Sequence, residues 1–329
     1  MQLNDNFADS FDLIGSSDSA IGSNVGFTGE PGEPNHAGIS PPLNSAWWSW
    51  RAPASGVVTI DTFGSNYDTS LAVYTGSALN NLSEIASNDD SNSFQSEVSF
   101  TATAGTTYQI AVDGFSSSTG QIDLNLELDL VFTQVGTAGS DNLNGSGAND
   151  VIRGLGGNDQ INGNGGNDVL FGNGGNDQIN GASQGDLING GAGSDTINGN
   201  GGSDTLIGGG GSDTIAGASG NDVIIGGGGG DTIFGNGGDD YINSGTGLDT
   251  VFLGTGAVIV VLETGAGFDL VNNFQVTQAK FQLGDGLSFA ELSFVDSNLG
   301  VNIFADNDLL AVVAGNQASL LNNSELFIF

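Results

Sequence analysis

The chain of 329 residues contains no cysteine, so it cannot form a disulfide framework. Only Arg51, Arg153 and Lys280 are basic, against 38 acidic residues, and the formal net charge is −35. Because almost nothing is present to neutralise phosphate, we expect no binding to nucleic acid or to an anionic membrane. No stretch approaches the roughly 18 apolar residues of a membrane-spanning helix, so we expect no membrane span.

Histidine occurs once, at His36. With no cysteine, the chain offers no Cys–His pair and no serine–histidine–aspartate spacing, so we predict that it is not an enzyme. His36 stands close in sequence to Glu30 and Glu33, and these three could ligate a metal together with Asp89 and Asp90. The alternative is a loop position held by hydrogen bonds, and we favour it.

Glycine is abundant, with 57 residues, and more than half of them lie in a repeat from Gly136 to Val251. Each repeat aspartate is followed, two positions later, by an aliphatic residue. With few exceptions, glycines stand five and two positions before the aspartate. No helical period of 3.6 fits such a unit, whereas a stacked β-solenoid does. The aspartates recur at every ninth position, as Asp141, Asp150, Asp159, Asp168, Asp177, Asp186, Asp195, Asp204, Asp213, Asp222, Asp231, Asp240 and Asp249.

Stacking such units brings carboxylates close together, because neighbouring strands lie about 4.8 Å apart. Unscreened repulsion between them should prevent the stack. A hard cation with six or more oxygen ligands relieves it, and carbonyl groups of a glycine-rich turn can supply the remaining oxygens. This ligand set suits Ca²⁺ better than Mg²⁺ or Zn²⁺, so we predict all thirteen aspartates as calcium ligands.

The unit from Gly154 to Asn162, G-L-G-G-N-D-Q-I-N, resembles the nonapeptide repeat of RTX proteins, G-G-x-G-x-D-x-U-x. The resemblance implies a parallel β-roll in which six residues form a turn, three form a strand, and two nonapeptides make one coil. The aspartates then form two columns, a first column starting at Asp141 and a second starting at Asp150. The gaps between successive coils would hold up to about 11 Ca²⁺ ions. The resemblance also implies an extracellular or cell-surface location reached by type I secretion.

Residues 1–130 lack the nine-residue period. Apolar and polar residues alternate there, most strictly from Ile122 to Leu130, with Gly/Ser/Asn-rich turns between the alternating segments. This pattern predicts six to eight short strands in a jelly-roll-like β-sandwich.

Several strings in this segment resemble the bacterial pre-peptidase C-terminal (PPC-like) domain, including Asn4–Asp9, Leu71–Gly76 and Ala111–Gly114. That family consists mostly of accessory modules for adhesion, substrate binding or secretion. The tryptophans Trp47, Trp48 and Trp50 could form a carbohydrate-stacking platform. Because Trp48 and Trp50 share one face of an alternating strand, we favour a place in the core for these two.

Residues 257–329 predict further strands that cap the roll, since an uncovered terminal coil would expose a sheet edge and an apolar end. Gly265–Val271 looks like one more repeat, placed slightly further from Asp249 than two nonapeptides would put it. The end, Glu325–Phe329, resembles an uncleaved secretion signal. We therefore predict an all-β chain with a sandwich at 1–130, a calcium roll at 131–256 and a capping segment at 257–329.

The positions beside each inward aliphatic should face outward, and they are polar on one sheet of the roll and largely apolar on the other. An exposed apolar surface usually marks a contact. It could pack on the flanking domains of the same chain or on another copy, giving a homo-oligomer or polymer. This apolar face comprises Val151, Val169, Phe171, Leu187, Ile207, Val223, Ile225 and Tyr241.

Together these features predict a secreted calcium-binding structural protein of the cell surface or extracellular matrix. We expect it to fold on Ca²⁺ and to self-assemble into a filament, layer or matrix. A second hypothesis is a calcium-dependent adhesin or carbohydrate-binding module that recognises a surface polysaccharide. A third, which we favour least, is the non-catalytic part of a secreted hydrolase.

Overall fold

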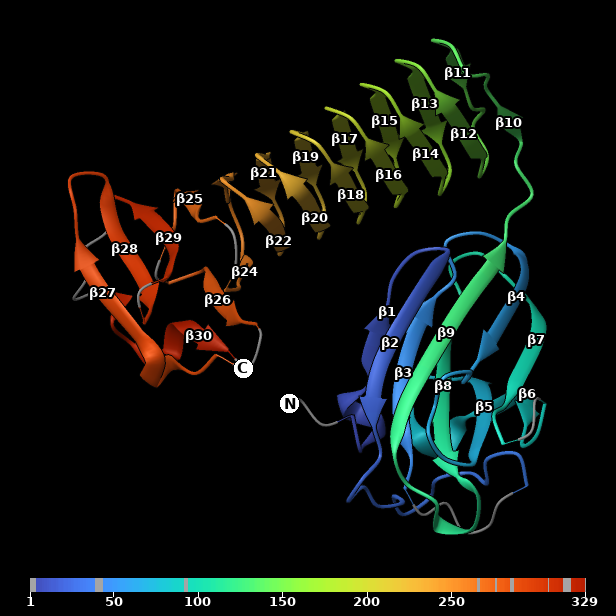
Figure 1. The fold of residues 1–329 in the computed structure, drawn as a ribbon. Helices are drawn as coiled ribbons and strands as arrows, with labels where there is room; N and C mark the ends of the chain where they lie inside the picture. Colours follow the sequence, from blue (N-terminus) through green and yellow to red (C-terminus); the bar gives the residue numbers. More distant parts are fainter. Residues whose placement is uncertain are drawn as a thin grey trace. The chain divides into compact units, whose positions relative to one another are not determined.

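The computed structural model describes residues 4–38, 44–91, 94–264, 267–275, 277–284, 287–306, 308–315 and 321–328. The chain divides into two compact units, Met1–Val131 and Phe132–Phe329, which are described separately (Figure 1). Apart from short 3-10 segments, the described elements are strands, as the all-β prediction requires. No helix among the described residues is long and apolar enough to cross a membrane.

The N-terminal unit is a sandwich of two sheets, as predicted, but it has nine strands instead of the expected six to eight. The five-stranded sheet has the order β1-β3-β8-β5-β6, from Phe11–Leu13, Ala46–Arg51, Thr107–Gly114, Thr69–Thr75 and Ser83–Asn88. The four-stranded sheet has the order β2-β9-β4-β7, from Ser17–Ser23, Gln121–Asp129, Gly56–Asp61 and Glu97–Ala102. The unit also contains three 3-10 turns, η1 (Phe7–Asp9), η2 (Leu79–Asn81) and η3 (Phe115–Ser117).

The alternation in Ile122–Leu130 follows from the pleat of β9, in which every second side chain faces the other sheet. Ile122, Leu124, Leu126 and Leu128 are buried, and their polar neighbours are not. Strand β3 is buried on both faces, because Trp47 packs against Phe7 on the side opposite to Trp48.

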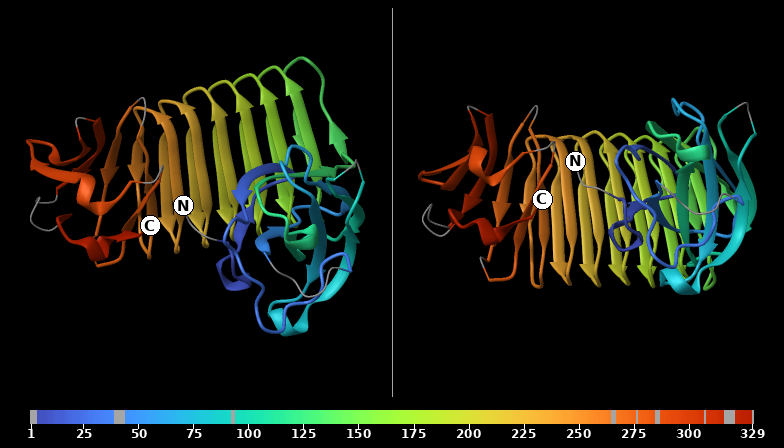
Figure 2. Two further views of the ribbon diagram at one scale, coloured as in Figure 1. Left: turned by 60° about the horizontal axis from the view of Figure 1, so that its bottom comes forward. Right: turned by 90° about the horizontal axis from the view of Figure 1, so that it is seen from below.

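The C-terminal unit contains a two-sheet parallel roll, in agreement with the predicted β-solenoid (Figure 2). Consecutive strands alternate between the sheets, and each pairs with the strand two repeats further along, as Val151 with Val169. One sheet contains β10 (Gln134–Val135), β12 (Val151–Gly156), β14 (Val169–Gly174), β16 (Leu187–Ala192), β18 (Thr205–Gly210), β20 (Val223–Gly229), β22 (Tyr241–Gly247), β24 (Ile259–Leu262), β26 (Lys280–Leu283) and β30 (Phe327–Ile328).

The other sheet of the roll carries the outward polar residues. It contains β11 (Asn142–Asn144), β13 (Gln160–Gly165), β15 (Gln178–Ser183), β17 (Thr196–Gly201), β19 (Thr214–Ser219), β21 (Thr232–Gly237), β23 (Thr250–Phe252), β25 (Asp269–Asn272), β29 (Asp308–Ala314), β28 (Gly300–Ala305) and β27 (Leu292–Asp296).

The repeat aliphatics form a single inner stack between the two sheets, from Ile152 to Val251, and all of them are buried. Burying each such side chain contributes roughly 1.5–3 kcal/mol to the stability of the roll. A single unit with one apolar residue cannot bury that residue by itself, so it depends on the neighbouring coils. The paired segments are longer than the three residues that the resemblance implies. In β13 the pairing with β15 extends over Gln160–Gly165. Asn164 adopts a positive φ of 73° there, so the chain turns while its backbone stays paired with the neighbouring strand.

The segment after the repeat continues both sheets of the roll. Strand β25 pairs with β23 and β29, and β29 pairs in antiparallel fashion with β28, which pairs with β27. Phe281 stacks on Phe274 and Phe327, so aromatic side chains extend the aliphatic core beyond Val251. η4 (Phe289–Glu291) and η5 (Ser324–Leu326) complete this region. Gly265, Ala266 and Phe329, which the sequence predictions for this segment include, lie outside the described residues.

Candidate metal centre

The repeat aspartates lie in two columns, one at each turn of the coil, with each side chain next to its counterpart in the next coil. The backbone N–H of Asp177 donates to Oδ1 of Asp195 at 2.7 Å. The same bond recurs along both columns, from Asp141 in the first coil to Asp249 in the last. One oxygen of each of these carboxylates is therefore fixed against the preceding coil.

The second oxygen of these carboxylates has no partner. Eleven Oδ2 atoms are buried and accept no hydrogen bond from the residues that the structure describes. Buried polar atoms are almost always paired, so a continuous row of unpaired anionic oxygens indicates a missing positive partner. They belong to Asp159, Asp168, Asp177, Asp186, Asp195, Asp204, Asp213, Asp222, Asp231, Asp240 and Asp249.

The glycine five positions before each of these aspartates except Asp249, where Ser244 stands instead, leaves the space into which this oxygen points. A Cβ built on Gly190 would lie 2.4 Å from Oδ2 of Asp195 and 2.8 Å from the carbonyl oxygen of Gly208 in the next coil. Gly172 and Gly208 have equivalent neighbours. A carboxylate oxygen and a main-chain carbonyl from successive coils thus flank one point, and only glycine keeps that point open.

Burial also makes the charged form of several of these aspartates unfavourable. Burial raises the pKa of Asp186 to about 8. A backbone hydrogen bond from Asp168 lowers this pKa, and the neighbouring carboxylates raise it further. For five other aspartates burial raises the pKa to about 6, namely Asp168, Asp195, Asp204, Asp231 and Asp240. A cation would remove this penalty, because it favours the ionised carboxylate.

The donor set fits calcium. It consists of carboxylate oxygens and main-chain carbonyls without nitrogen or sulfur, which is what a hard cation with six to eight oxygen ligands takes. Among the described residues no group of three or more His, Cys, Asp or Glu side chains converges on one point, so carbonyls must supply part of each shell. When bound, the ions would supply the positive charge between the carboxylates of successive coils.

Comparison with protein families gives an independent result for this segment. The model of the RTX calcium-binding nonapeptide repeat matches in four copies, at residues 135–170, 154–188, 180–215 and 216–251. The repeat region is an RTX calcium-binding β-roll. The model of the bacterial pre-peptidase C-terminal (PPC) domain matches residues 44–114 in the sandwich. Comparison with curated proteins gives no match.

The first two aspartates of the RTX roll differ from the other eleven. Oδ2 of Asp141 accepts hydrogen bonds from the N–H and hydroxyl of Thr137, at 2.6 and 2.9 Å. Oδ2 of Asp150 accepts the same pair from Ser146. For Asp150 burial raises the pKa and these hydrogen bonds lower it, with a net downward shift. A hydroxyl residue four positions before the aspartate occurs only in these two repeats and is the sequence signal for the difference.

Replacing a central aspartate should therefore weaken the calcium-loaded roll far more than replacing the first one. We expect Asp195→Asn to lower its free energy of unfolding by about 3 kcal/mol, because a cation loses a buried charged partner. Asp141→Asn should lower it by about 1 kcal/mol, because its carboxylate already has hydrogen-bond donors. Urea unfolding at saturating calcium measures both, and equal effects would contradict the division of the aspartates into two groups.

In the N-terminal unit, three of the five residues that could ligate a metal, His36, Glu33 and Glu30, are engaged in other contacts. His36 is buried, with Nδ1 2.9 Å from the hydroxyl of Tyr74 and Nε2 2.9 Å from Oε1 of Glu33. Glu30 accepts a hydrogen bond from the N–H of Phe7. This arrangement fits the loop held by hydrogen bonds that the sequence favours.

Asp89 and Asp90 form a separate acidic group of the PPC domain with Asp68. Burial raises the pKa of Asp68, and the charge of Asp90 raises it further. Burial has the same effect on Asp89, where both neighbouring charges add to it.

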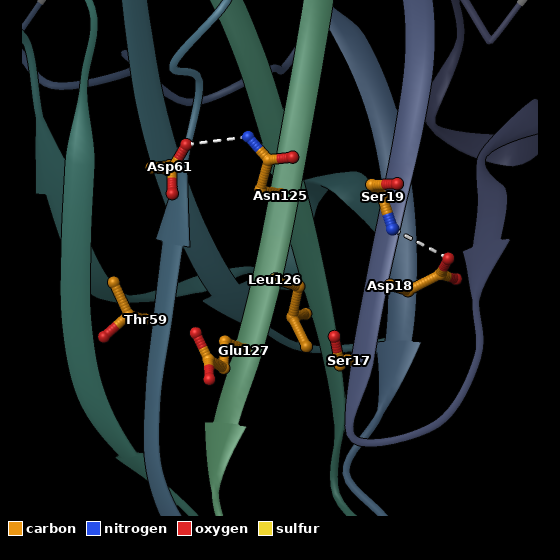
Figure 3. Close-up of a pocket in the computed structure, with 8 residues that line it drawn as sticks. All are labelled: Ser17, Asp18, Ser19, Thr59, Asp61, Asn125, Leu126 and Glu127. Carbon is orange, nitrogen blue, oxygen red and sulfur yellow. Dashed lines mark hydrogen bonds between the residues drawn. The ribbon is translucent and has the colours of Figure 1, made fainter.

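No tryptophan of the PPC domain is available for stacking on a sugar, because Trp47, Trp48 and Trp50 are completely buried. The domain instead has a polar hollow of about 390 Å³ on its four-stranded sheet (Figure 3). There Nδ2 of Asn125 donates to Oδ1 of Asp61 at 2.9 Å. The hollow has no aromatic lining and consists of Ser17, Asp18, Ser19, Thr59, Asp61, Asn125, Leu126 and Glu127.

Proposed function

We propose that this chain is a secreted structural protein of the cell surface or extracellular matrix that folds when it meets calcium and then self-assembles. The two rows of buried, unpartnered carboxylate oxygens carry this proposal. At low calcium the repulsion along each row opposes coil stacking, so the chain leaves the cell unfolded. Outside, calcium ions allow the coils to stack. RTX repeats and PPC domains are typical of secreted proteins and are non-catalytic in themselves.

The proposed ion number is up to about 11, one for each gap between successive aspartates of the two columns. We further propose that the thirteen repeat aspartates are the carboxylate ligands. The first coil contributes least, because hydrogen bonds already satisfy Asp141 and Asp150. Type I secretion, directed by the C-terminal segment, is the proposed export route.

The proposed assembly surface is the outer side of the sheet that contains β18, β20 and β22. Ile207, Val223, Ile225 and Tyr241 lie there on neighbouring strands and are half-buried. Val169 and Leu187 of the same face are buried. An apolar strip along a flat, regular sheet favours contact with a second copy, because the two surfaces repeat with the same strand spacing.

The double variant Ile207→Asn/Ile225→Asn tests the self-assembly. Light scattering and negative-stain electron microscopy of the full chain should show polymers or sheets with millimolar calcium and none in chelator. The double variant should bind calcium and stay monomeric, since it places polar groups on the contact surface.

The matched control for this experiment is Thr196→Asn/Thr214→Asn, on the polar sheet, where both threonines are exposed. It should assemble like the unaltered chain. Assembly by both double variants, or a monomeric unaltered chain in calcium, would exclude the apolar face as the contact.

The alternative function is a calcium-dependent adhesin or carbohydrate-binding module that uses the PPC domain. The polar hollow on the four-stranded sheet favours it, since hydroxyl, amide and carboxylate groups can bind sugar hydroxyls. The burial of all three tryptophans weighs against it, because aromatic stacking is absent there. A role as the non-catalytic part of a secreted hydrolase has no observation that favours it.

A further inference from the structure

The outer face of the polar sheet of the roll carries no charge. Strands β13, β15, β17, β19, β21 and β23 follow one another along this sheet (Figure 1). None of the six contains an acidic or basic residue, although the whole chain has a formal net charge of −35. Their outward side chains are amides, hydroxyls, alanines and phenylalanines. A neutral ligand suits such a face, because the carboxylates elsewhere in the chain repel an anionic one.

A ladder of amide side chains orders one half of this face. Nδ2 of Asn162 donates to Oδ1 of Asn144 at 3.2 Å, and Nδ2 of Asn180 donates to Oδ1 of Asn162 at 3.4 Å. An amide has two N–H groups, so each of these donors keeps one for a ligand. A shallow hollow of about 430 Å³ lies over β13, β15 and β17, and Thr196 and Asn198 line it together with the amides.

Beyond this hollow, strand β19 forms a notch in the face. Ala216 of β19 is paired with Asn198 of β17 on one side and with Phe234 of β21 on the other. The next outward residue of β19, Ala218, is also small, and both alanines are partly exposed. Paired positions two strands apart lie about 9–10 Å from each other. A flat ring in van der Waals contact on both sides needs about 7–8 Å, so the notch has room for one.

The ring of Phe234 turns one face towards this notch. Phe234 and Phe252 of the next coil are stacked, with ring centroids 4.9 Å apart and an angle of 7° between the planes. Because Phe252 covers one side of the Phe234 ring, the opposite side is directed to the coil of Ala216. The negative face of an aromatic ring attracts the slightly positive C–H groups on the flat side of a sugar ring.

We propose that this uncharged face of the RTX roll binds a neutral polysaccharide. One sugar ring stacks on Phe234 above Ala216, and hydroxyl groups of the adjoining sugars bind the amides over β13, β15 and β17. The amides repeat with the spacing of the coils, so a chain of sugars contacts several coils at once and its weak contacts add together.

The site is distinct from the hollow of the PPC domain, which has no aromatic lining. It needs only the folded roll and goes beyond the proposed self-assembly. A second copy of the chain fits this face less well than the apolar face, because hydrated amides and hydroxyls gain little from contact with their own kind.

Native gel electrophoresis of the full chain in calcium tests the proposal. The gels contain one of three neutral polysaccharides, galactomannan, xyloglucan or dextran, or the anionic polysaccharide hyaluronan. At least one neutral polysaccharide should retard the unaltered chain, and hyaluronan should not. Retardation by none of the three neutral polysaccharides, or equal retardation by hyaluronan, would overturn the proposal.

Three variants locate the ligand on the roll. Phe234→Ala removes the stacking surface and should raise the dissociation constant about tenfold. Ala216→Gln fills the notch with a side chain that the same sheet already carries at Gln178, and it should weaken binding at least as much. Phe252→Ala is the matched control, since it removes a ring from the same row but keeps the notch side of Phe234. Its dissociation constant should stay within about twofold of the unaltered value.

Circular dichroism in calcium shows whether each variant is folded. Unchanged affinity in a folded Ala216→Gln variant would overturn the site even if Phe234→Ala failed to fold. Loss of calcium-dependent assembly in Ala216→Gln without polysaccharide would assign the face to a contact between copies and would also overturn it. A chain that gains no strand signal with calcium would overturn the proposed function as well. A chain that folds and assembles but binds no neutral polysaccharide would overturn this site alone.

Discussion

Removing calcium from the full chain should unfold the RTX roll and leave the PPC domain folded. Each ion held at 100 times its dissociation constant adds about 2.7 kcal/mol to the stability of the folded state. A whole domain is typically stable by only about 5–15 kcal/mol, so losing roughly four to six such ions is enough to unfold it. Circular dichroism in chelator at pH 7 should therefore lose the strand signal of Phe132–Phe329, and excess calcium should restore it.

Tryptophan fluorescence provides the internal control for this experiment. All three tryptophans lie in the PPC domain and are fully buried, so their emission reports on that unit alone. Their emission maximum and its thermal transition should stay within a few degrees of the calcium-loaded values. A roll that keeps its strand signal in chelator at pH 7 would contradict calcium-dependent folding. A simultaneous loss of both signals would show that the two units unfold together.

Much of the roll could be predicted because its sequence repeats. If two nonapeptides form one coil, the distance in sequence from Asp159 to Asp177 gives the length of that coil. The register of the two sheets agrees with this length. One aliphatic residue per unit has only one place to be buried, in the stack between the sheets. Local spacing and tertiary position coincide in such a fold, since each unit contacts only its neighbours.

Other features of the roll depend on contacts that the nine-residue repeat pattern does not predict. Asp141 and Asp150 satisfy the repeat pattern, but Thr137 and Ser146 supply hydrogen bonds that later repeats lack. Asp269 breaks the regular spacing and still joins its column, because the sheet register and not the chain length places it.

The tryptophan-rich strand β3 shows a similar limit. Alternation placed Trp48 and Trp50 in the core, and it could not place Trp47. Trp47 is buried by Phe7, which lies far earlier in the chain, and by His36 and Tyr74.

Protons should partly replace calcium in the roll, because the same carboxylates take up either. In the metal-free fold burial raises the pKa of Asp195 and Asp231 to about 6, above the usual value near 4 for aspartate. Between these values the folded state binds more protons than the unfolded state, so its stability rises as pH falls. The contribution is complete below about pH 4 and is lost as pH rises through about 6. The metal-free roll should be unfolded at pH 7 and regain its strand signal near pH 5.

Asp186→Asn is the variant that makes this test specific. Asp186 has the highest pKa of the column aspartates, about 8, so it resists ionisation most strongly in the folded roll. Asparagine removes that charge at every pH, and the folding midpoint of the metal-free variant should move upward, by a few tenths of a pH unit. The measurement belongs near pH 5 and not at the isoelectric point of about 4.1, where precipitation would obscure it. Because Asp186→Asn should also weaken calcium binding at pH 7, one substitution should stabilise the metal-free roll and destabilise the loaded one. Opposite signs of these two effects are the result expected if protons and calcium neutralise the same carboxylates.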